Sequence, residues 1–198
     1  TYWTGKTPSF MIQQCFKNWK YYNPEYEINI ITEDSLEKYV EKIPENLFQN
    51  SPARQSDWVR LAVLKDYGGI WLDASSILSQ SLAWIHEEQR KNPCDFIGFY
   101  LKKFTRYESY PVIESWFMAA PPESPFITDS LSEFENQALP RTGVEYVEYL
   151  TSLGNFEHLR QNIDGLAYLN IHLSMQKTLH SGKSYKIIVQ QAEKGPFY

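Results

Sequence analysis

The side chains that stand out as candidates for chemistry are three carboxylates and one guanidinium, those of Asp57, Asp73, Glu114 and Arg60. Asp57 and Arg60 are three residues apart, so on a helix they would share one face and could form an ion pair. Asp73 follows a short apolar run, and its carboxylate could supply an oxygen ligand to a hard divalent cation. Glu114 interrupts another apolar run, where a buried carboxylate is costly unless it is paired or used. These positions indicate a polar site on an apolar framework.

The helix expected around the first of these carboxylates has clear ends. Ser51 can serve as its N-cap, and Pro52 suits the first helical position because no backbone N–H is needed there. Residues 53–67 then favour a helix with apolar side chains gathered on one face. Gly68 and Gly69 end the helix, where a positive φ angle is needed.

A three-residue apolar run, Ile70–Leu72, follows the two glycines and is too short for anything but a buried strand. Asp73 stands where this strand ends, and Ala74, Ser75 and Ser76 come next. In open α/β sheets, ligands bind at the carboxyl ends of strands. We therefore expect Asp73 to face a ligand.

The segment SDWVRLAVLKDYGGIWLDAS resembles the core motif of GT-A glycosyltransferases whose sugar-binding region carries a DXD motif. Within that group the sequence is most similar to the capsular polysaccharide synthesis protein family, a relative of the mannosyltransferase and clostridial-toxin glucosyltransferase groups. The positions that match the family pattern are Ser56, Asp57, Arg60, Gly68, Gly69, Ile70, Trp71 and Asp73. The sequence departs from the broader pattern at Ser75, where the second aspartate of the DXD motif would stand.

The resemblance implies a single α/β domain over residues 1–198 with the GT-A fold. This is a Rossmann-like nucleotide-sugar-binding fold, in which helices flank a mixed central sheet. Family members begin one strand before the segment at Trp3 and continue beyond residues 195–198, so we expect a domain trimmed at both ends. The implied activity is hexosyl transfer from a nucleotide diphosphate sugar to a glycan acceptor, with retention of configuration, in capsular or surface polysaccharide synthesis.

Roles for the donor-binding residues also follow from the resemblance. Trp3 would lie against the nucleotide base, Asp57 would contact hydroxyls of the donor sugar, and Arg60 would meet the sugar or the diphosphate. Asp73 would be a catalytic residue, a donor contact and a metal ligand, with Ser75 beside it at the donor.

Glu114 is the second expected catalytic residue, on the acceptor or sugar side of the donor. Structural alternatives stay open for several of these positions. Trp3 could cap the core, and Glu114 could belong to a structural ion pair. Asp57 and Arg60 could form only a helix-face ion pair, which is worth little if it is exposed.

A divalent cation, Mn²⁺ or Mg²⁺, is the cofactor that the resemblance implies, because charge on the departing diphosphate must be neutralised. Asp73 would supply a carboxylate, whereas Ser75 offers only a neutral hydroxyl, which is a weaker ligand. Other groups that could complete the ligands or share the diphosphate charge are His172, His180, Glu193, Arg60, Lys102, Lys103 and Arg106.

The composition and net charge of the chain indicate which classes of partner it can bind. The chain has 198 residues, of which 42% are hydrophobic and 22% charged, as in an ordinary globular protein. A net charge of −5 argues against nucleic acid as a partner, because phosphate binding needs clustered Lys and Arg. The aromatic fraction of 16% suits both an aromatic core and stacking on sugars or bases. We expect a UDP-sugar rather than a GDP-sugar as donor, and an oligosaccharide or lipid-linked glycan as acceptor.

Two cysteines, Cys15 and Cys94, make neither a disulfide framework nor a metal site. This low cysteine use agrees with the bacterial cytoplasm, the natural compartment for nucleotide sugars. No apolar stretch of about 18 residues is present. We therefore expect a cytoplasmic protein with peripheral association at the inner face of the membrane, and the Golgi lumen is the alternative.

The rest of the sequence predicts a framework of helices and strands around the central motif. Helices are expected over residues 8–20, 34–40, 82–88, 125–137, 144–153 and 169–179, and strands over 28–32, 95–100, 112–120 and 185–189. The first helix should bury Met11, Ile12, Cys15, Phe16 and Trp19. A basic and aromatic loop over residues 101–111 could cover the site.

Two rival hypotheses come from other functional classes. A degenerate GT-A domain that only binds glycans or partners is suggested by Ser75 in the place of an acid. A dinucleotide-dependent enzyme has no support, because no G-x-G-x-x-G follows any expected strand.

Overall fold

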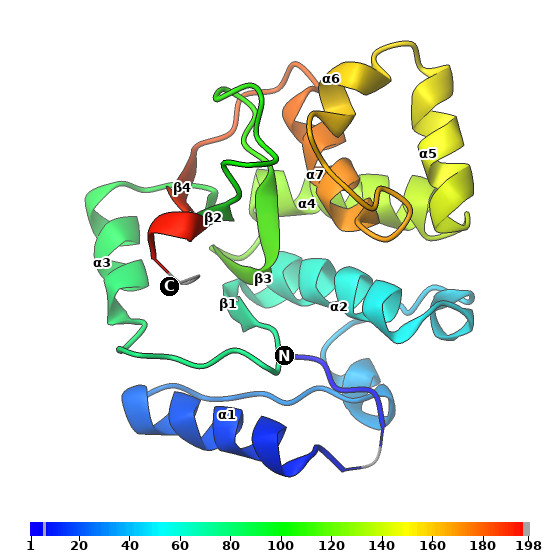
Figure 1. Cartoon of the computed structure of the whole chain (residues 1–198). Helices are drawn as coiled ribbons and strands as arrows, with labels where there is room; N and C mark the ends of the chain where they lie inside the picture. Colours follow the sequence, from blue (N-terminus) through cyan, green and yellow to red (C-terminus); the bar gives the residue numbers. More distant parts are fainter. Residues whose placement is uncertain (6, 196–198) are drawn as a thin grey trace.

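A mixed four-stranded sheet with helices around it forms the framework of the computed structural model, which describes residues 1–5 and 7–195 (Figure 1). The strands are β1 (Gly69–Leu72), β2 (Phe96–Tyr100), β3 (Ile113–Ala120) and β4 (Ile187–Gln191), in the spatial order β1-β3-β2-β4. β3 is antiparallel to both β1 and β2, whereas β4 is parallel to β2. The expected α/β class, with a mixed sheet flanked by helices, is confirmed.

The helix and strand predicted around the motif are present as α2 (Pro52–Tyr67) and β1. Gly68 and Gly69 join them with φ angles of 64° and 91°, which L side chains rarely adopt. A Cβ on Gly68 would also lie 2.5 Å from the backbone nitrogen of Pro122, so the turn packs directly on the segment after β3. Ser51 occupies the N-cap position, but its side chain makes no capping hydrogen bond. The predicted N-cap position of Ser51 is therefore confirmed, and Pro52 follows it in the first turn.

The helices after β3 form a layer that packs against α2 and the sheet. They are α4 (Pro125–Glu133), the π-helix η3 (Phe134–Ala138), α5 (Gly143–Ser152), α6 (Phe156–Arg160) and α7 (Asn170–Leu179). The single helix predicted over residues 125–137 is thus divided, and α6 was not predicted. The π-helix carries Glu135, which accepts a hydrogen bond of 2.8 Å from the indole N–H of Trp58 on α2. This contact joins the two helical segments across the core.

Helices α1 (Phe10–Tyr22) and α3 (Ala83–Lys91) lie apart from that layer (Figure 1). In α1 the expected core face is only partly buried: Cys15 and Trp19 are enclosed, but 66% of Met11 is exposed. Trp19 also fixes α1 to the chain after β1, since its indole N–H donates to the carbonyl of Ser76 at 2.8 Å. The prediction that Met11 belongs to the core was wrong, because no element covers it among the described residues.

The strand predicted over residues 28–32 does not form in the part of the chain that the structure describes. Only a single parallel bridge joins Tyr2 to Ile31 there. Thr32 instead begins the 3₁₀ helix η1 (Glu33–Lys38), where a capping box with Ser35 ends the extended segment. The other 3₁₀ helices are η2 (Leu47–Gln49) and η4 (Ala192–Lys194).

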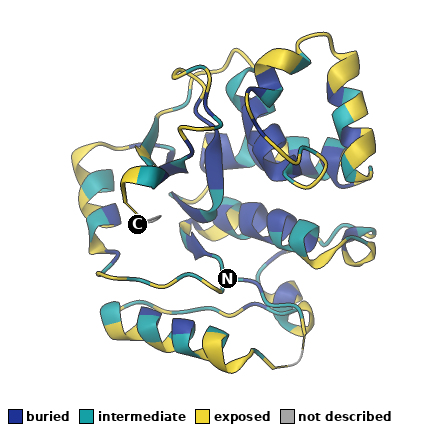
Figure 2. Ribbon diagram, viewed as in Figure 1, coloured by how far each residue is buried: buried dark blue, intermediate teal, exposed yellow. Residues whose placement is uncertain are grey.

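The main core lies between the sheet and the layer of α2, α4 and α7 (Figure 2). Its largest enclosed side chains are aromatic, and they include Trp58, Phe96, Phe126, Phe134 and Tyr146. Both cysteines are buried and unbridged. Within the described residues, no helix has the length and apolar character needed to cross a membrane.

Candidate functional site

Three of the predicted donor-binding residues line one small cavity of about 270 Å³: Trp3, Asp73 and Ser75. The cavity lies at the end of β1 and beside the first turns of α2. Its other lining residues are Tyr2, Thr4, Ile12, Pro52, Ala53, Ser56 and Ala74. The structure therefore brings residues 3, 56 and 73, which are far apart in the chain, to one concave surface.

Asp73 is held in place from one side. Its Oδ1 accepts a hydrogen bond of 2.9 Å from the indole N–H of Trp71 and lies 3.3 Å from Nη1 of Arg60. Trp71 and Asp73 are two residues apart, so the alternation of an extended chain places both side chains on the same side. About 36% of the Asp73 side chain remains exposed. Among the described residues both of these contacts use Oδ1, so the outer part of the carboxylate faces the cavity.

Arg60 is the centre of the polar contacts beneath the cavity. Its guanidinium is 3.2 Å from Oδ1 of Asp57 and bonds the carbonyl of Ser115 through Nη1 at 2.5 Å. Nη2 also donates to Oγ of Ser56 at 3.1 Å, and the guanidinium lies over the ring of Trp71. Only 4% of Arg60 is exposed. The side chain is thus placed to orient Asp57 and Asp73, and it does not line the cavity.

Asp57 lies deeper than Asp73 and is 7% exposed. Burial raises the pKa of its carboxyl, and the nearby charge of Arg60 opposes that shift. His172 and Asp73 act on the same carboxyl, His172 favouring its charged form and Asp73 disfavouring it. The expected helix-face pair with Arg60 is present, and it is buried rather than exposed.

Glu114 points from β3 toward α7, where it meets His172. The distance from Nε2 of His172 to Oε1 of Glu114 is 3.7 Å, and the side chains of His172 and Glu114 are 6% and 11% exposed. Nδ1 of His172 is buried and has no hydrogen-bond partner among the described residues. The sequence offered no signal for this pairing, because the two residues are separated by most of the helical layer.

Together, the residues Asp73, Arg60, Asp57, His172 and Glu114 form a polar line that runs from the small cavity into the space between α2, β3 and α7. Each neighbour in the line is joined by a salt bridge or by a charge interaction. A buried line of this kind is costly unless its charges are paired or used.

The remaining candidate metal ligands have other partners. His180 stacks on Tyr110 with ring centroids 3.9 Å apart, and Glu193 accepts the backbone N–H groups of Lys102 and Lys103. In the described part of the chain, no group of three or more His, Cys, Asp or Glu side chains could hold a metal ion. Of the described residues that line the cavity, Asp73 alone offers a carboxylate, and the exposed Ser75 offers a hydroxyl beside it.

This donor set fits a cation that is bound jointly with a phosphate ligand. Mg²⁺ commonly takes one or two protein carboxylates, substrate phosphates and several waters. The outer side of the Asp73 carboxylate and the hydroxyl of Ser75 meet that modest requirement, because both border the same cavity. They do not make a site that would hold a cation strongly without the ligand.

The charged side chains of the basic loop over residues 101–111 contact other residues of the same loop. Its three cations each contact a neighbour in the loop: Lys102 pairs with Glu108, Lys103 lies over Phe104, and Arg106 lies over Tyr107. In this arrangement none of the three lines the small cavity. Exposed pairs of this kind contribute little to stability.

Gln161, which directly follows α6, holds that loop by hydrogen bonds. Its Oε1 accepts the backbone N–H groups of Arg106 and Tyr107 at 2.8 and 3.0 Å, and its Nε2 donates to the carbonyl of Tyr110 at 2.6 Å. Gln161 adopts a φ of 46°, in the region that favours glycine, so the surrounding contacts must maintain this conformation. The loop is thereby fixed to the helical layer.

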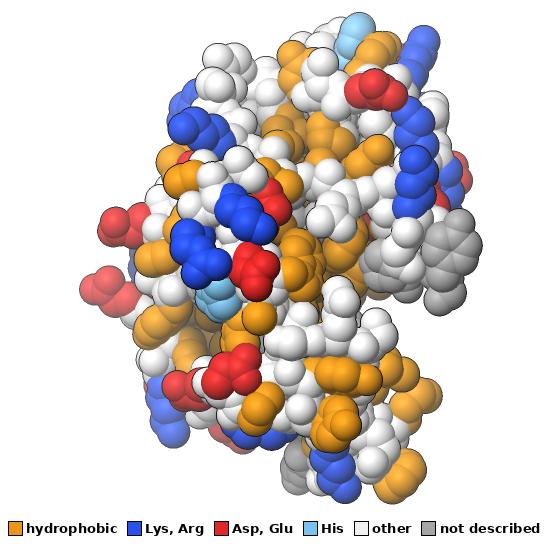
Figure 3. All heavy atoms as spheres, turned by 90° about the vertical axis from the view of Figure 1, so that its left-hand side faces the viewer, with side chains coloured by type: hydrophobic (Ala, Val, Ile, Leu, Met, Phe, Trp, Pro, Cys, Tyr) orange, Lys and Arg blue, Asp and Glu red, His pale blue; other side chains and the backbone are white. Residues whose placement is uncertain are grey.

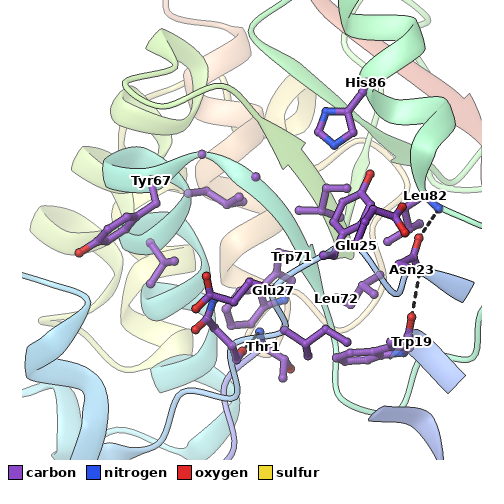
Figure 4. Close-up of a pocket in the computed structure, with 18 of the residues that line it drawn as sticks. Thr1, Trp19, Asn23, Glu25, Glu27, Tyr67, Trp71, Leu72, Leu82 and His86 are labelled. Carbon is purple, nitrogen blue, oxygen red and sulfur yellow. Dashed lines mark hydrogen bonds between the residues drawn. The ribbon is translucent and has the colours of Figure 1, made fainter. Parts of the chain in front are cut away.

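A second, larger cavity of about 1060 Å³ lies on the opposite side of β1 from β3 (Figure 4). All four residues of β1 line it, together with Thr1, Trp19, Tyr67 and Leu82. Figure 3 shows the corresponding face, where hydrophobic side chains gather in a hollow between the upper and lower parts of the molecule. None of the predicted site residues is among those that line this cavity. We place the candidate site at the small cavity, because Asp73 lines it and stands at the end of the polar line.

Comparison with known proteins gives one family. The model of the family described as "Capsular polysaccharide synthesis protein" matches residues 5–149, which is more than half of the chain. This match confirms the resemblance drawn from the motif around Asp73. No curated protein sequence matches the chain. A solved structure titled "PaToxG Glycosyltransferase" is similar over 93% of this chain and 85% of that one, at 15% identity and a TM-score of 0.45. A likeness that distant carries no inference about this chain.

Proposed function

The chain belongs to the capsular polysaccharide synthesis protein family, a GT-A-like glycosyltransferase family, and we propose that it transfers a sugar from a nucleotide diphosphate sugar to a glycan acceptor. One observation carries the proposal. Asp73, Ser75 and Trp3 border a single cavity beside the N-terminal end of α2, with Arg60 orienting Asp73 from beneath. This combination provides a carboxylate, an aromatic face and a helix terminus within one concave surface.

The diphosphate of the donor would lie against the start of α2. Pro52 and Ala53 line the cavity, and the side chain of Ser51 leaves the first-turn N–H groups uncapped. Uncapped N–H groups and the helix dipole both favour an anion at this position. Trp3 would stack on the base, which is its expected role, since its ring borders the same cavity.

Asp73 would hold the donor through the outer side of its carboxylate, with the hydroxyl of Ser75 beside it. A divalent cation, Mn²⁺ or Mg²⁺, would be held by these two groups together with the diphosphate, and it would neutralise charge on the leaving group. Arg60 keeps the carboxylate in one orientation, and its own positive charge lies 3.3 Å from Oδ1. The contribution of this chain is therefore orientation and charge compensation.

The finer features of the activity form part of the same proposal. Transfer would proceed with retention, from a UDP-sugar in preference to a GDP-sugar, to an oligosaccharide or lipid-linked acceptor. Asp57 would contact hydroxyls of the donor sugar, and Glu114 would act on the acceptor or sugar side. The protein would work in the cytoplasm, at the inner face of the membrane, in capsular or surface polysaccharide synthesis.

A screen of donor hydrolysis tests the proposal. Purified protein is incubated with UDP-glucose, UDP-galactose, UDP-N-acetylglucosamine and GDP-mannose, each with Mn²⁺, with Mg²⁺ or with a chelator, and the released nucleotide is measured. We expect hydrolysis of at least one UDP-sugar, faster with a cation than with the chelator. Nucleotide release no faster than in the protein-free control, for every donor and condition, would show the proposal to be wrong.

A second candidate function is that of a degenerate domain that binds glycans or a partner without catalysis. It is favoured by Ser75, which stands exposed at the position where a second carboxylate would hold the cation. Calorimetry with the same nucleotide sugars separates the two functions. A binding module should take up a glycan but no nucleotide sugar, whereas the transferase should bind a nucleotide sugar more tightly when Mn²⁺ is present.

A further inference from the structure

We propose that Glu114 and His172 together form a subsite for one hydroxyl group of the sugar, and this inference rests on the proposed transferase function. The hydroxyl would donate to Oε1 of Glu114 and accept from Nε2–H of His172. His172 thereby becomes a sugar-binding residue.

The distance between the two side chains is the first observation. Nε2 of His172 and Oε1 of Glu114 are 3.7 Å apart, which is longer than a hydrogen bond. A structural ion pair would gain energy by closing to about 2.8 Å. An oxygen atom placed beside the gap can lie at hydrogen-bond distance from both atoms. The open spacing therefore suits a bridging hydroxyl better than a direct pair.

The second observation is the burial of both groups. Glu114 and His172 are 8% and 5% exposed, and Nδ1 of His172 has no hydrogen-bond partner among the described residues. A buried carboxylate and a buried imidazole that lack close partners are costly to the folded protein. A sugar hydroxyl beside Nε2 and Oε1 would accept from the one and donate to the other, because one O–H group offers both functions, while Nδ1 of His172 would keep its present surroundings.

The third observation is the connection to the donor cavity. His172 acts electrostatically on Asp57, Asp57 pairs with Arg60 at 3.2 Å, and Arg60 reaches Asp73. The backbone of β3 joins the same contacts, since the carbonyl of Ser115, next to Glu114, accepts from Arg60 at 2.5 Å. The pair is thus connected to Asp73 through Asp57 and Arg60, and neither Glu114 nor His172 is among the residues that line the small cavity.

Deoxy sugars measure this contact directly. The UDP-sugar that wild-type protein hydrolyses fastest, among UDP-glucose, UDP-galactose and UDP-N-acetylglucosamine, is compared with its 3-, 4- and 6-deoxy forms. Wild-type protein should lose about 10- to 100-fold in kcat/KM for one of these forms, because a hydrogen bond to a charged group is lost. In Glu114→Gln and in His172→Gln that particular penalty should shrink to about 3-fold or less, while the penalties at the other positions stay as in wild type.

Matched controls carry the same substitutions at exposed positions. Glu148→Gln and His158→Gln should keep the full wild-type pattern of penalties, because both side chains are exposed. If His172→Gln fails to fold, Glu114→Gln decides alone, since its side chain has the same shape as that of the wild-type residue. Penalties in the variants that equal the wild-type values at every hydroxyl would overturn the subsite and leave the transferase intact. Absence of any turnover in wild-type protein would overturn the transferase itself, and the subsite with it.

Discussion

Two charged regions of this molecule differ in how they use their charges. In the buried polar line, Arg60 joins Asp57 of α2, Asp73 directly after β1 and Ser115 of β3, and Ser115 is 55 residues away in the chain. In the loop over residues 101–111, each cation contacts a neighbour within the loop, at the surface. Both regions looked like phosphate-binding candidates by residue type. Burial and the sequence distance between partners separate them, and they place the candidate site beneath the small cavity.

The largest effect should come from Arg60→Met. This change leaves Asp57 buried without its cation, and breaking a buried pair from one side costs about 3–5 kcal/mol of stability. Urea denaturation of the variant and the wild type measures the loss. The control is Lys102→Met in the surface loop, which should leave the denaturation midpoint unchanged within error. Equal behaviour of the two variants would remove the distinction between the regions.

A nearly equal effect, on activity instead of stability, is expected for Asp73→Asn. The amide keeps the shape of the carboxylate but loses its charge toward the donor, so turnover should fall about 10²- to 10³-fold. The melting temperature should stay close to that of the wild type, because the Asp73 side chain is 36% exposed. Steady-state donor hydrolysis and thermal melting are measured on the same samples. Full turnover in this variant would contradict the proposed donor site.

Gln161→Ala should have a moderate effect that is confined to the surface loop. The change removes the acceptor for the backbone N–H groups of Arg106 and Tyr107, at a cost of about 1–3 kcal/mol. Hydrogen exchange at residues 101–111 should accelerate, while turnover stays within about threefold of the wild type. A large loss of turnover would mean that the loop takes part in the site after all.

The smallest effect concerns the pH dependence of stability. Burial raises the pKa of Glu133, whose carboxylate accepts from the hydroxyl of Tyr146. A carboxyl with a raised pKa in the folded state contributes stability below its unfolded pKa, and this contribution is lost as pH rises through the folded value. Glu133→Gln should therefore gain stability relative to the wild type as pH rises from 4 to 7, by about 2 °C in melting temperature. A constant difference across this range would show that Glu133 does not titrate in it.

Much of the framework around the small cavity could be predicted from local sequence. The helix over residues 52–67, the glycine turn and the short strand each have strong signals: a proline near the start, two glycines with positive φ, and an apolar run. These signals depend on neighbours in the chain. The position of Asp73 at the strand end followed from them directly.

Features that depend on distant partners were not visible in the sequence. Residues 28–32 have the composition of a strand but meet only Tyr2 in a single bridge, so the ladder does not extend. Met11 follows the helical period of its neighbours and is still exposed, because period alone does not say which face is covered. The pairing of Glu114 with His172 needs the folded position of α7 on β3. The predicted roles of Glu114 and His172 in binding remain predictions.

The length of the short strand β1 also fixes the position of Asp73. Between Gly68, which packs against Pro122, and Asp73 there are only four residues, and all four are paired in one register with β3. One added residue would turn Asp73 to the other face of the sheet, and two would carry it roughly 6–7 Å further along the strand. Arg60 is anchored on α2 and could follow neither change. The length of this segment is therefore as restrictive as the identity of its last residue, and relatives with the same chemistry should tolerate substitutions here far better than insertions or deletions.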